Sequence, residues 1–137
     1  MRQSDSDQNL LTAAQNGDAK QVELLLERGA DVNAADGWTA LMVAASSGHA
    51  NVVGLLLERG ADVNAANPGC WTALMAAAAY GHANVVELLL SSGADVNLAI
   101  SNGQTALMSA QQAGTEYVVK VLLRHGAEVP PELQGNA

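Results

Sequence analysis

The chain repeats itself with a period of slightly over thirty residues, and this periodicity restricts its fold more than any other feature. The segments 38–64 and 71–97 differ at only six positions. A fixed period of this length is typical of a solenoid, in which each repeat stacks on its neighbours. Glycines occur in pairs twelve residues apart, and successive pairs are displaced by 31, 33 and 33 residues: Gly17 and Gly29, Gly48 and Gly60, Gly81 and Gly93, Gly114 and Gly126.

Each repeat contains the signals for two short helices. In the second repeat, Thr39 can cap the start of a helix over 40–47, and Gly48 can adopt the left-handed conformation that ends it. A second helix is predicted from about residue 50 to 59, before Gly60. Helices this short are marginal alone, so each pair must bury an apolar face on its neighbours. The apolar residues of that face in the second helix are Val52, Val53, Leu55, Leu56 and Leu57.

The amino-acid sequence of each repeat resembles that of the ankyrin repeat. The resemblance rests on Gly-Trp-Thr-Ala-Leu-Met at 37–42, Gly-His at 48–49 and Leu-Leu-Leu-Glu-Arg-Gly-Ala-Asp-Val-Asn at 55–64, and it extends over about residues 8–129. It implies an all-α, L-shaped solenoid of four helix-turn-helix repeats, with a β-turn or hairpin finger at each junction and the first helices lining a concave face. The departures are Ala40, Ala73 and Ala106 where the family usually has Pro, and Met42, Met75 and Met108 where it usually has His.

The ends of the chain differ from its middle. We expect a flexible segment over 1–7, repeats at about 8–35, 36–66, 67–99 and 100–129, and a loose tail over 130–137. The junction before Thr39 is two residues shorter than those before Thr72 and Thr105, which predicts a shorter first finger. Terminal repeats need a polar outer face, and polar side chains favour a complete, capped domain here: Gln15, Asn16, Asp18 and Lys20 in the first repeat, and Gln111, Gln112, Lys120 and Arg124 in the fourth.

Charge and composition exclude several classes of function. Fourteen acidic and six basic residues give a net charge of −8, which opposes binding to nucleic acid and to anionic membranes. The single Cys70 cannot form a disulfide framework or a thiolate metal site. The start MRQSDSDQN is polar, and the apolar run over 72–80 is too short to cross a membrane. We expect a cytoplasmic monomer.

The aromatic residues are the strongest candidates for contact with a partner. Trp38 and Trp71 occupy the same position in successive fingers, where the resemblance to the ankyrin family implies contact residues. Tryptophan is enriched in the energetically dominant parts of interfaces. Tyr80 replaces Ser47 on the first helix and is expected to face the same concave side, beside Ser46, Ala79, Gln112 and Ala113. The alternative is that each indole ring packs on the neighbouring finger.

For two further sets of residues, a structural role explains the sequence as well as a binding role does. Met42, Met75 and Met108 recur at the repeat period, and methionine serves either adaptable binding surfaces or a core between stacked helices. Asp36, Pro68, Asn102 and Gln104 fill finger positions as polar rim contacts, although turn chemistry explains the first three as well. The predicted partner-binding set is Trp38, Trp71, Tyr80, Met42, Met75, Ser46, Gln104 and Gln112.

Chemistry at a catalytic or metal site is not predicted. His49 and His82 each follow a glycine and open the second helix, and their strict period favours helix capping and hydrogen bonds between repeats over a metal pair. Cys70 lies in a turn with no base nearby in the sequence. Asn33, Asn64 and Asn97 close Asp-Val-Asn turns, where their amides can bond the backbone. No catalytic motif or cofactor motif is recognised, so we expect no enzyme and no cofactor.

Two hypotheses of function remain. The first is a protein-protein interaction module, acting as an adaptor, inhibitor or assembly factor, that binds another protein through its concave face and fingers. The second is a structural or designed, consensus-like scaffold without a dedicated partner, which the near-identity of 38–64 and 71–97 would also explain.

Overall fold

The part of the chain that the structure describes folds into eight α-helices. The computed structural model describes residues 3–35 and 37–129. Within these residues the pairing of extended backbone is limited to two isolated bridges, Ala35 with Thr39 and Ala99 with Thr105, so the all-α prediction is confirmed. The helices are α1 (Gln3–Asn16), α2 (Ala19–Glu27), α3 (Ala40–Ser47), α4 (Ala50–Glu58), α5 (Ala73–Ala79), α6 (Ala83–Ser91), α7 (Ala106–Ala113) and α8 (Glu116–Arg124).

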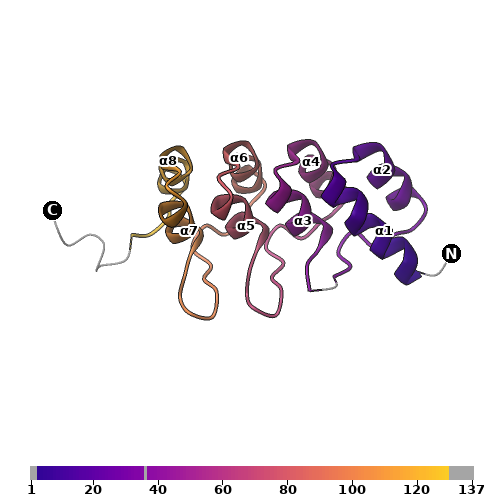
Figure 1. The fold of residues 1–137 in the computed structure, drawn as a ribbon, viewed down its shortest axis with the longest axis horizontal. Helices are drawn as coiled ribbons and strands as arrows, with labels where there is room; N and C mark the ends of the chain where they lie inside the picture. Colours follow the sequence, from indigo (N-terminus) through magenta and orange to yellow (C-terminus); the bar gives the residue numbers. More distant parts are fainter. Residues whose placement is uncertain (1–2, 36, 130–137) are drawn as a thin grey trace.

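The helices stack as consecutive pairs in two layers. α1, α3, α5 and α7 form one layer, and α2, α4, α6 and α8 form the other (Figure 1). Each helix packs on its partner and on the same layer of the adjacent pair, as α5 does on α3, α6 and α7. The loops before α5 and α7 project to one side as fingers (Figure 1). The loop before α3, predicted to be the shortest finger, contains Asp36, which lies outside the described residues.

The helix boundaries follow from capping. Thr39 precedes α3, and its hydroxyl accepts a hydrogen bond from the Met42 backbone N–H at 3.2 Å. Thr72 and Thr105 cap α5 and α7 in the same way. Gly48 ends α3 with a φ of 79°, a left-handed conformation that side chains disfavour. These bounds agree with the predicted first helix at 40–47.

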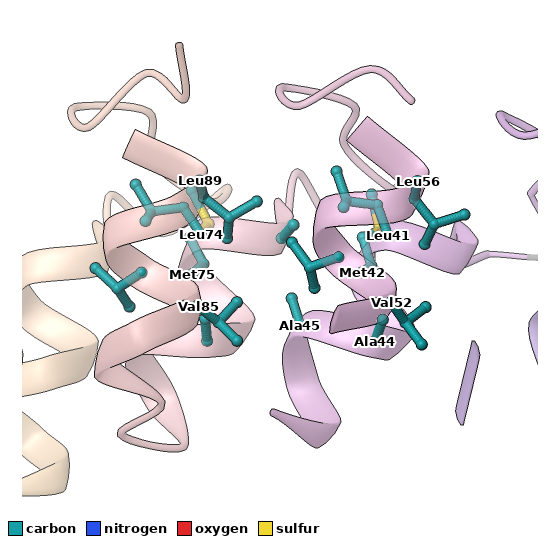
Figure 2. Close-up of a cluster of buried hydrophobic side chains, with 14 of the residues drawn as sticks. Leu41, Met42, Ala44, Ala45, Val52, Leu56, Leu74, Met75, Val85 and Leu89 are labelled. Atoms are coloured by element: carbon teal, nitrogen blue, oxygen red, sulfur yellow. The ribbon is translucent and has the colours of Figure 1, made fainter. Parts of the chain in front are cut away.

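The core between the layers is built from the same residue types in each pair. Figure 2 shows Leu41, Met42, Val52 and Leu56 of one pair beside their equivalents in the next, Leu74, Met75, Val85 and Leu89. The buried alanines Ala44 and Ala45 have small side chains that let neighbouring helices approach closely. The core therefore runs continuously along the stack.

Two methionines predicted to contact a partner belong to this core instead. Met42 is 1% exposed and Met75 is 2% exposed. Each lies in the first turn of its helix, and its side chain is buried among the leucines of the same pair (Figure 2). The partner-binding prediction is wrong for these two residues, and the alternative core role holds.

Histidines connect adjacent pairs through the backbone. The Nε2 atom of His49 lies 3.0 Å from the Gln15 carbonyl oxygen, and that of His82 lies 2.9 Å from the Ser46 carbonyl oxygen. Because a carbonyl oxygen only accepts, Nε2 carries the hydrogen. The expected hydrogen bonds between repeats are thus present, but neither side chain caps its helix. A Cβ on Gly48 would lie 2.7 Å from His82 Nδ1, so this position requires glycine for space as well as for its φ.

Asparagines form a second set of connections. The Asn64 side chain donates to the Gly93 carbonyl oxygen at 3.3 Å and accepts from the Asp95 N–H at 2.7 Å. Asn33 and Asn97 make the equivalent pair of bonds to the next turn. The predicted bonding of these amides to the backbone is confirmed, and it joins one turn to the next rather than closing a single turn.

The first helix begins earlier than expected. We predicted a flexible segment over 1–7, whereas α1 starts at Gln3. The carboxylate of Asp7 accepts a hydrogen bond from the Asp31 N–H at 2.9 Å, the same type of bond that asparagines make further along the stack. This hydrogen bond anchors the first turns of α1. The polar sequence of this segment did not indicate that such a contact forms. The tail expected over 130–137 lies outside the described residues.

Candidate partner-binding surface

The finger before α5 is a tight hairpin that fixes the backbone of Trp71. The side-chain oxygen of Asn67 accepts hydrogen bonds from the backbone N–H of Gly69 at 2.9 Å and of Trp71 at 3.0 Å. The Asn67 N–H donates to the Trp71 carbonyl oxygen at 3.0 Å. Asn67 was absent from the predicted site, although asparagine before Pro-Gly is a recognisable turn signal.

The finger before α7 has the same design. The Ile100 N–H donates to the Gln104 carbonyl oxygen at 2.9 Å, and the Asn102 side chain accepts from the Gln104 N–H at 3.0 Å. Gly103 takes a φ of 87° here, and Cys70 takes a φ of 67° at the equivalent position of the preceding finger. Asn102 and Cys70 therefore have turn positions, and Cys70 is free and exposed. Asp36 of the first finger lies outside the described residues.

Three of the four aromatic side chains meet around one hollow. A hollow of about 170 Å³ is lined by Trp38, Trp71, Ala76, Ala79 and Tyr80, and we call it the aromatic hollow. Tyr80 is 67% exposed, Trp38 is 36% exposed and Trp71 is half-buried. The structure thus brings together three aromatic residues of the predicted partner-binding set. Ala79 was expected beside Tyr80, whereas Ala76 was missed because alanine carries no functional signal.

The Tyr80 side chain is supported by the residue that precedes the next helix, α6. Its ring stacks on His82 with a centroid distance of 6.4 Å and an interplanar angle of 26°. His82 is itself held by the Ser46 carbonyl oxygen. Ser46, another predicted contact, is half-buried on α3. An exposed tyrosine with a fixed neighbour loses less side-chain entropy on binding than a free one.

Gln104 and Gln112 also meet, at the next finger. The Gln104 Nε2 donates to the Gln112 Oε1 at 3.0 Å and lies 3.2 Å from the Ser109 Oγ. The two amides border a second hollow of about 390 Å³, which Asn102, Gly103 and the half-buried Met108 also line. This pair of side chains offers both donors and acceptors without a charge.

The opposite face has a hollow that the sequence did not predict. About 360 Å³ of space lies between α4 and α6, bordered by Gly54, Leu57, Leu88 and Ser92 among others. At the flanking junctions a side-chain pair crosses from one helix pair to the next: Glu23 with Arg59 at 3.3 Å, and Tyr117 with Glu87 at 2.9 Å. Gly54 occupies the position equivalent to Glu87, and Ser92 occupies the position equivalent to Arg59, so these two residues cannot form a pair of this kind. Both positions are among the six differences between 38–64 and 71–97.

The contact of Tyr117 with Glu87 has an electrostatic consequence. The Tyr117 hydroxyl donates to the Glu87 carboxylate, and this hydrogen bond, with the repulsion that a phenolate would feel from the carboxylate, raises the pKa of Tyr117 above its ordinary value of 10.0. Tyr117 is 54% exposed on α8. Tyr117 and Tyr80 are thus both exposed tyrosines, and they lie on opposite faces of the stack.

Other kinds of site are not found in the described part of the chain. Residues 3–35 and 37–129 contain no group of three or more His, Cys, Asp or Glu side chains placed to hold a metal ion. None of the helices over these ranges has the length and hydropathy needed to cross a membrane.

Comparison with known families identifies the repeat. Residues 2–67 and 64–132 each match the family model described as ankyrin repeats (3 copies), so that the matches span nearly the whole chain. No curated protein matches the chain at a significant level. The helix pairs, the fingers and these matches agree, and the chain belongs to the ankyrin repeat family.

Proposed function

We propose that the protein binds another protein across the surface that holds the aromatic hollow and the pair Gln104 and Gln112. Ankyrin repeats are in general protein-protein interaction modules, and this chain is composed of them. The observation that carries the proposal is the meeting of Trp38, Trp71 and Tyr80 around one open hollow. The residues Trp38, Trp71, Tyr80, Gln104 and Gln112 all belong to the partner-binding set that the sequence analysis proposed.

The aromatic hollow has the properties of a binding hot spot. Tryptophan and tyrosine dominate measured interface energies because they bury a large area with few rotatable bonds. Full burial of a large apolar side chain stabilises a complex by about 1.5–3 kcal/mol. Because Tyr80 and Trp38 are still exposed in the isolated chain, that burial is left for a partner to supply.

The wider proposal is a binding module with no catalytic activity, acting as an adaptor, inhibitor or assembly factor. Members of the family are typically not enzymes, and no catalytic motif was recognised in the sequence. We include in it a monomeric state and a cytoplasmic location, with neither nucleic acid nor membrane as partner, since the net charge of −8 opposes both.

The competing proposal is a scaffold without a dedicated partner. Its support is the near-identity of 38–64 and 71–97. A scaffold needs no large aromatic side chains on one open surface, whereas a binding module does. We therefore favour the binding module.

Affinity capture from the native host, followed by mass spectrometry, tests the proposal. The wild type is compared with the double variant Trp38→Ala/Trp71→Ala and with Leu24→Ala, which removes a side chain that is 39% exposed on α2. We expect one specific partner to be retained by wild type and Leu24→Ala and lost by the double variant. A partner that the double variant retains in full would place the binding site elsewhere, and the absence of any specific partner would favour the scaffold.

A further inference from the structure

Charged residues avoid the helices α3, α5 and α7 and the fingers that precede α5 and α7. The segments 63–81 and 96–115 contain no Asp, Glu, Lys or Arg, and the segment 33–48 contains only Asp36. Between residues 37 and 129, every such residue lies on α4, α6 or α8 or in the turns that follow them. A chain with a net charge of −8 therefore presents a nearly uncharged surface around the aromatic hollow.

The absence of charge restricts what can be buried there. An ionised side chain that enters a contact surface loses hydration. This loss is offset by an opposite charge, by several hydrogen bonds or, for a cation and only in part, by the faces of aromatic rings. The aromatic hollow, lined by two indole rings, a phenol ring and two alanines, offers no opposite charge. A carboxylate of the partner would therefore bind poorly here. A lysine or arginine would gain about 0.5–1 kcal/mol from the faces of exposed rings, which is less than the gain of about 1.5–3 kcal/mol from burying an apolar ring.

The volume of the hollow limits the size of the group. A closed apolar cavity of about 150 Å³ holds one benzene molecule. The aromatic hollow, at about 170 Å³, has room for one side chain of similar size. Because it is open on one side, the group enters from the partner without any movement of the helices.

We propose that the aromatic hollow receives one uncharged, ring-sized apolar side chain of the partner, and that the partner segment around it is uncharged and hydrogen-bonds to Gln104 and Gln112. This inference rests on the proposed function and specifies the chemical class of the partner segment. The two glutamines provide the donors and acceptors that an uncharged segment, with its backbone amides and polar side chains, requires. The partner segment is then recognised by its shape and its hydrogen bonds, and a carboxylate in the hollow is disfavoured.

Small capped amino acids test this inference directly. The probes are N-acetylphenylalanine amide, N-acetyllysine amide and N-acetylglutamate amide, which share a backbone and differ in side-chain charge. The readout is the pair of indole N–H signals in ¹⁵N-labelled protein, because the chain has only two tryptophans. We expect the phenylalanine compound to shift both signals saturably, with a dissociation constant of about 1 mM or weaker. The lysine compound should bind more weakly than the phenylalanine compound, and the glutamate compound should leave both signals in place.

The two tyrosines supply matched variants. Tyr80→Ala removes one wall of the hollow and should weaken the response to the phenylalanine compound about tenfold, whereas Tyr117→Ala, on the opposite face, should leave it unchanged. Tyr80 is well exposed, so its removal leaves the core intact, and circular dichroism verifies this.

Two results would overturn the inference. If a charged compound shifts both indole signals as strongly as the neutral one, and Tyr80→Ala abolishes that shift, the hollow is a site but not one for uncharged groups. If no compound shifts either signal, the hollow does not receive a single side chain. In both cases the capture experiment with Trp38→Ala/Trp71→Ala still decides separately whether this surface binds a protein.

Discussion

Asparagine side chains carry much of the polar connection between successive turns. Each of Asn33, Asn64 and Asn97 uses both its oxygen and its nitrogen on backbone groups of the following turn. Neither aspartate nor serine could supply this donor and acceptor pair at the same length. The repetition of one residue along the chain therefore reflects a bond that is made again at each junction.

Replacing Asn64 by alanine should destabilise the protein by about 1–2 kcal/mol, because two backbone groups lose their partners and regain only water. Urea unfolding measures this change. The control is Asn51→Ala, which removes an exposed asparagine of α4 and should change the free energy of unfolding by less than about 0.5 kcal/mol. Equal effects of the two substitutions would contradict the structural role of Asn64.

Replacing Glu87 by glutamine should lower the pKa of Tyr117, since the carboxylate that repels the phenolate is removed. Ultraviolet titration of tyrosine measures the shift, and Tyr80→Phe leaves Tyr117 as the sole tyrosine. A raised pKa in the folded state means that the contact adds stability below pH 10.0 and loses it as the pH rises through the raised pKa. A titration unaffected by the substitution would show that the two side chains do not interact in solution.

Position within the repeat could be predicted for single residues, but side-chain direction could not. The period placed Trp38, Trp71 and Tyr80 at equivalent or adjacent sites, and the structure brings them to one hollow. The same period marked Met42 and Met75, which are buried. Buried residues and exposed residues of a short helix both recur at the repeat period. The period therefore cannot distinguish a core residue from a surface residue, and only the packing of the helices does.

At the scale of the helix, Gly54 is an exception to the pattern. It lies inside α4, where glycine is about 1 kcal/mol less favourable than alanine. A Cβ at this position would meet the Leu88 Cδ2 at 3.8 Å, which is an ordinary contact. The residue has no positive φ and no steric need for glycine, unlike Gly48.

Gly54→Ala should therefore stabilise the protein by about 0.5–1 kcal/mol, as measured by thermal or urea unfolding. Gly48→Ala is the matched comparison and should destabilise it, because the new Cβ would combine a φ of 79° with a contact of 2.7 Å to His82. A loss of stability in Gly54→Ala would mean that the hollow between α4 and α6 requires its present shape.

Helix boundaries could be predicted well where capping residues mark them. The predicted first helix at 40–47 matches α3, and the predicted second helix ends one residue beyond α4. The start of α1 could not be predicted, because Asp7 is held by the backbone of Asp31, a contact across 24 residues. The crossing of Tyr117 to Glu87 was missed for the same reason, since it joins residues 30 apart.

For the whole molecule, stability depends on contacts between adjacent helix pairs. In the part of the chain that the structure describes, α5 and α6 pack on helices of two neighbouring pairs, whereas α7 and α8 pack on those of one. The free energy of opening a pair rises with the number of neighbours that cover it. The stack should open first at its ends.

Hydrogen exchange monitored by NMR should accordingly show slower exchange of the backbone amides in α5 and α6 than in α7 and α8. Leu89 and Leu122 are equivalent and fully buried, which makes their amides a direct comparison. Uniform exchange rates along the stack would indicate that the protein opens only as a single cooperative unit.

The claim that the aromatic hollow binds a protein partner is tested most directly by the affinity of the captured partner for two single variants. Calorimetry would compare Tyr80→Ala with Tyr117→Ala, two exposed tyrosines on opposite faces of the stack. We expect the dissociation constant to rise about tenfold or more for Tyr80→Ala and less than about twofold for Tyr117→Ala. Equal changes, or a larger change for Tyr117→Ala, would contradict it.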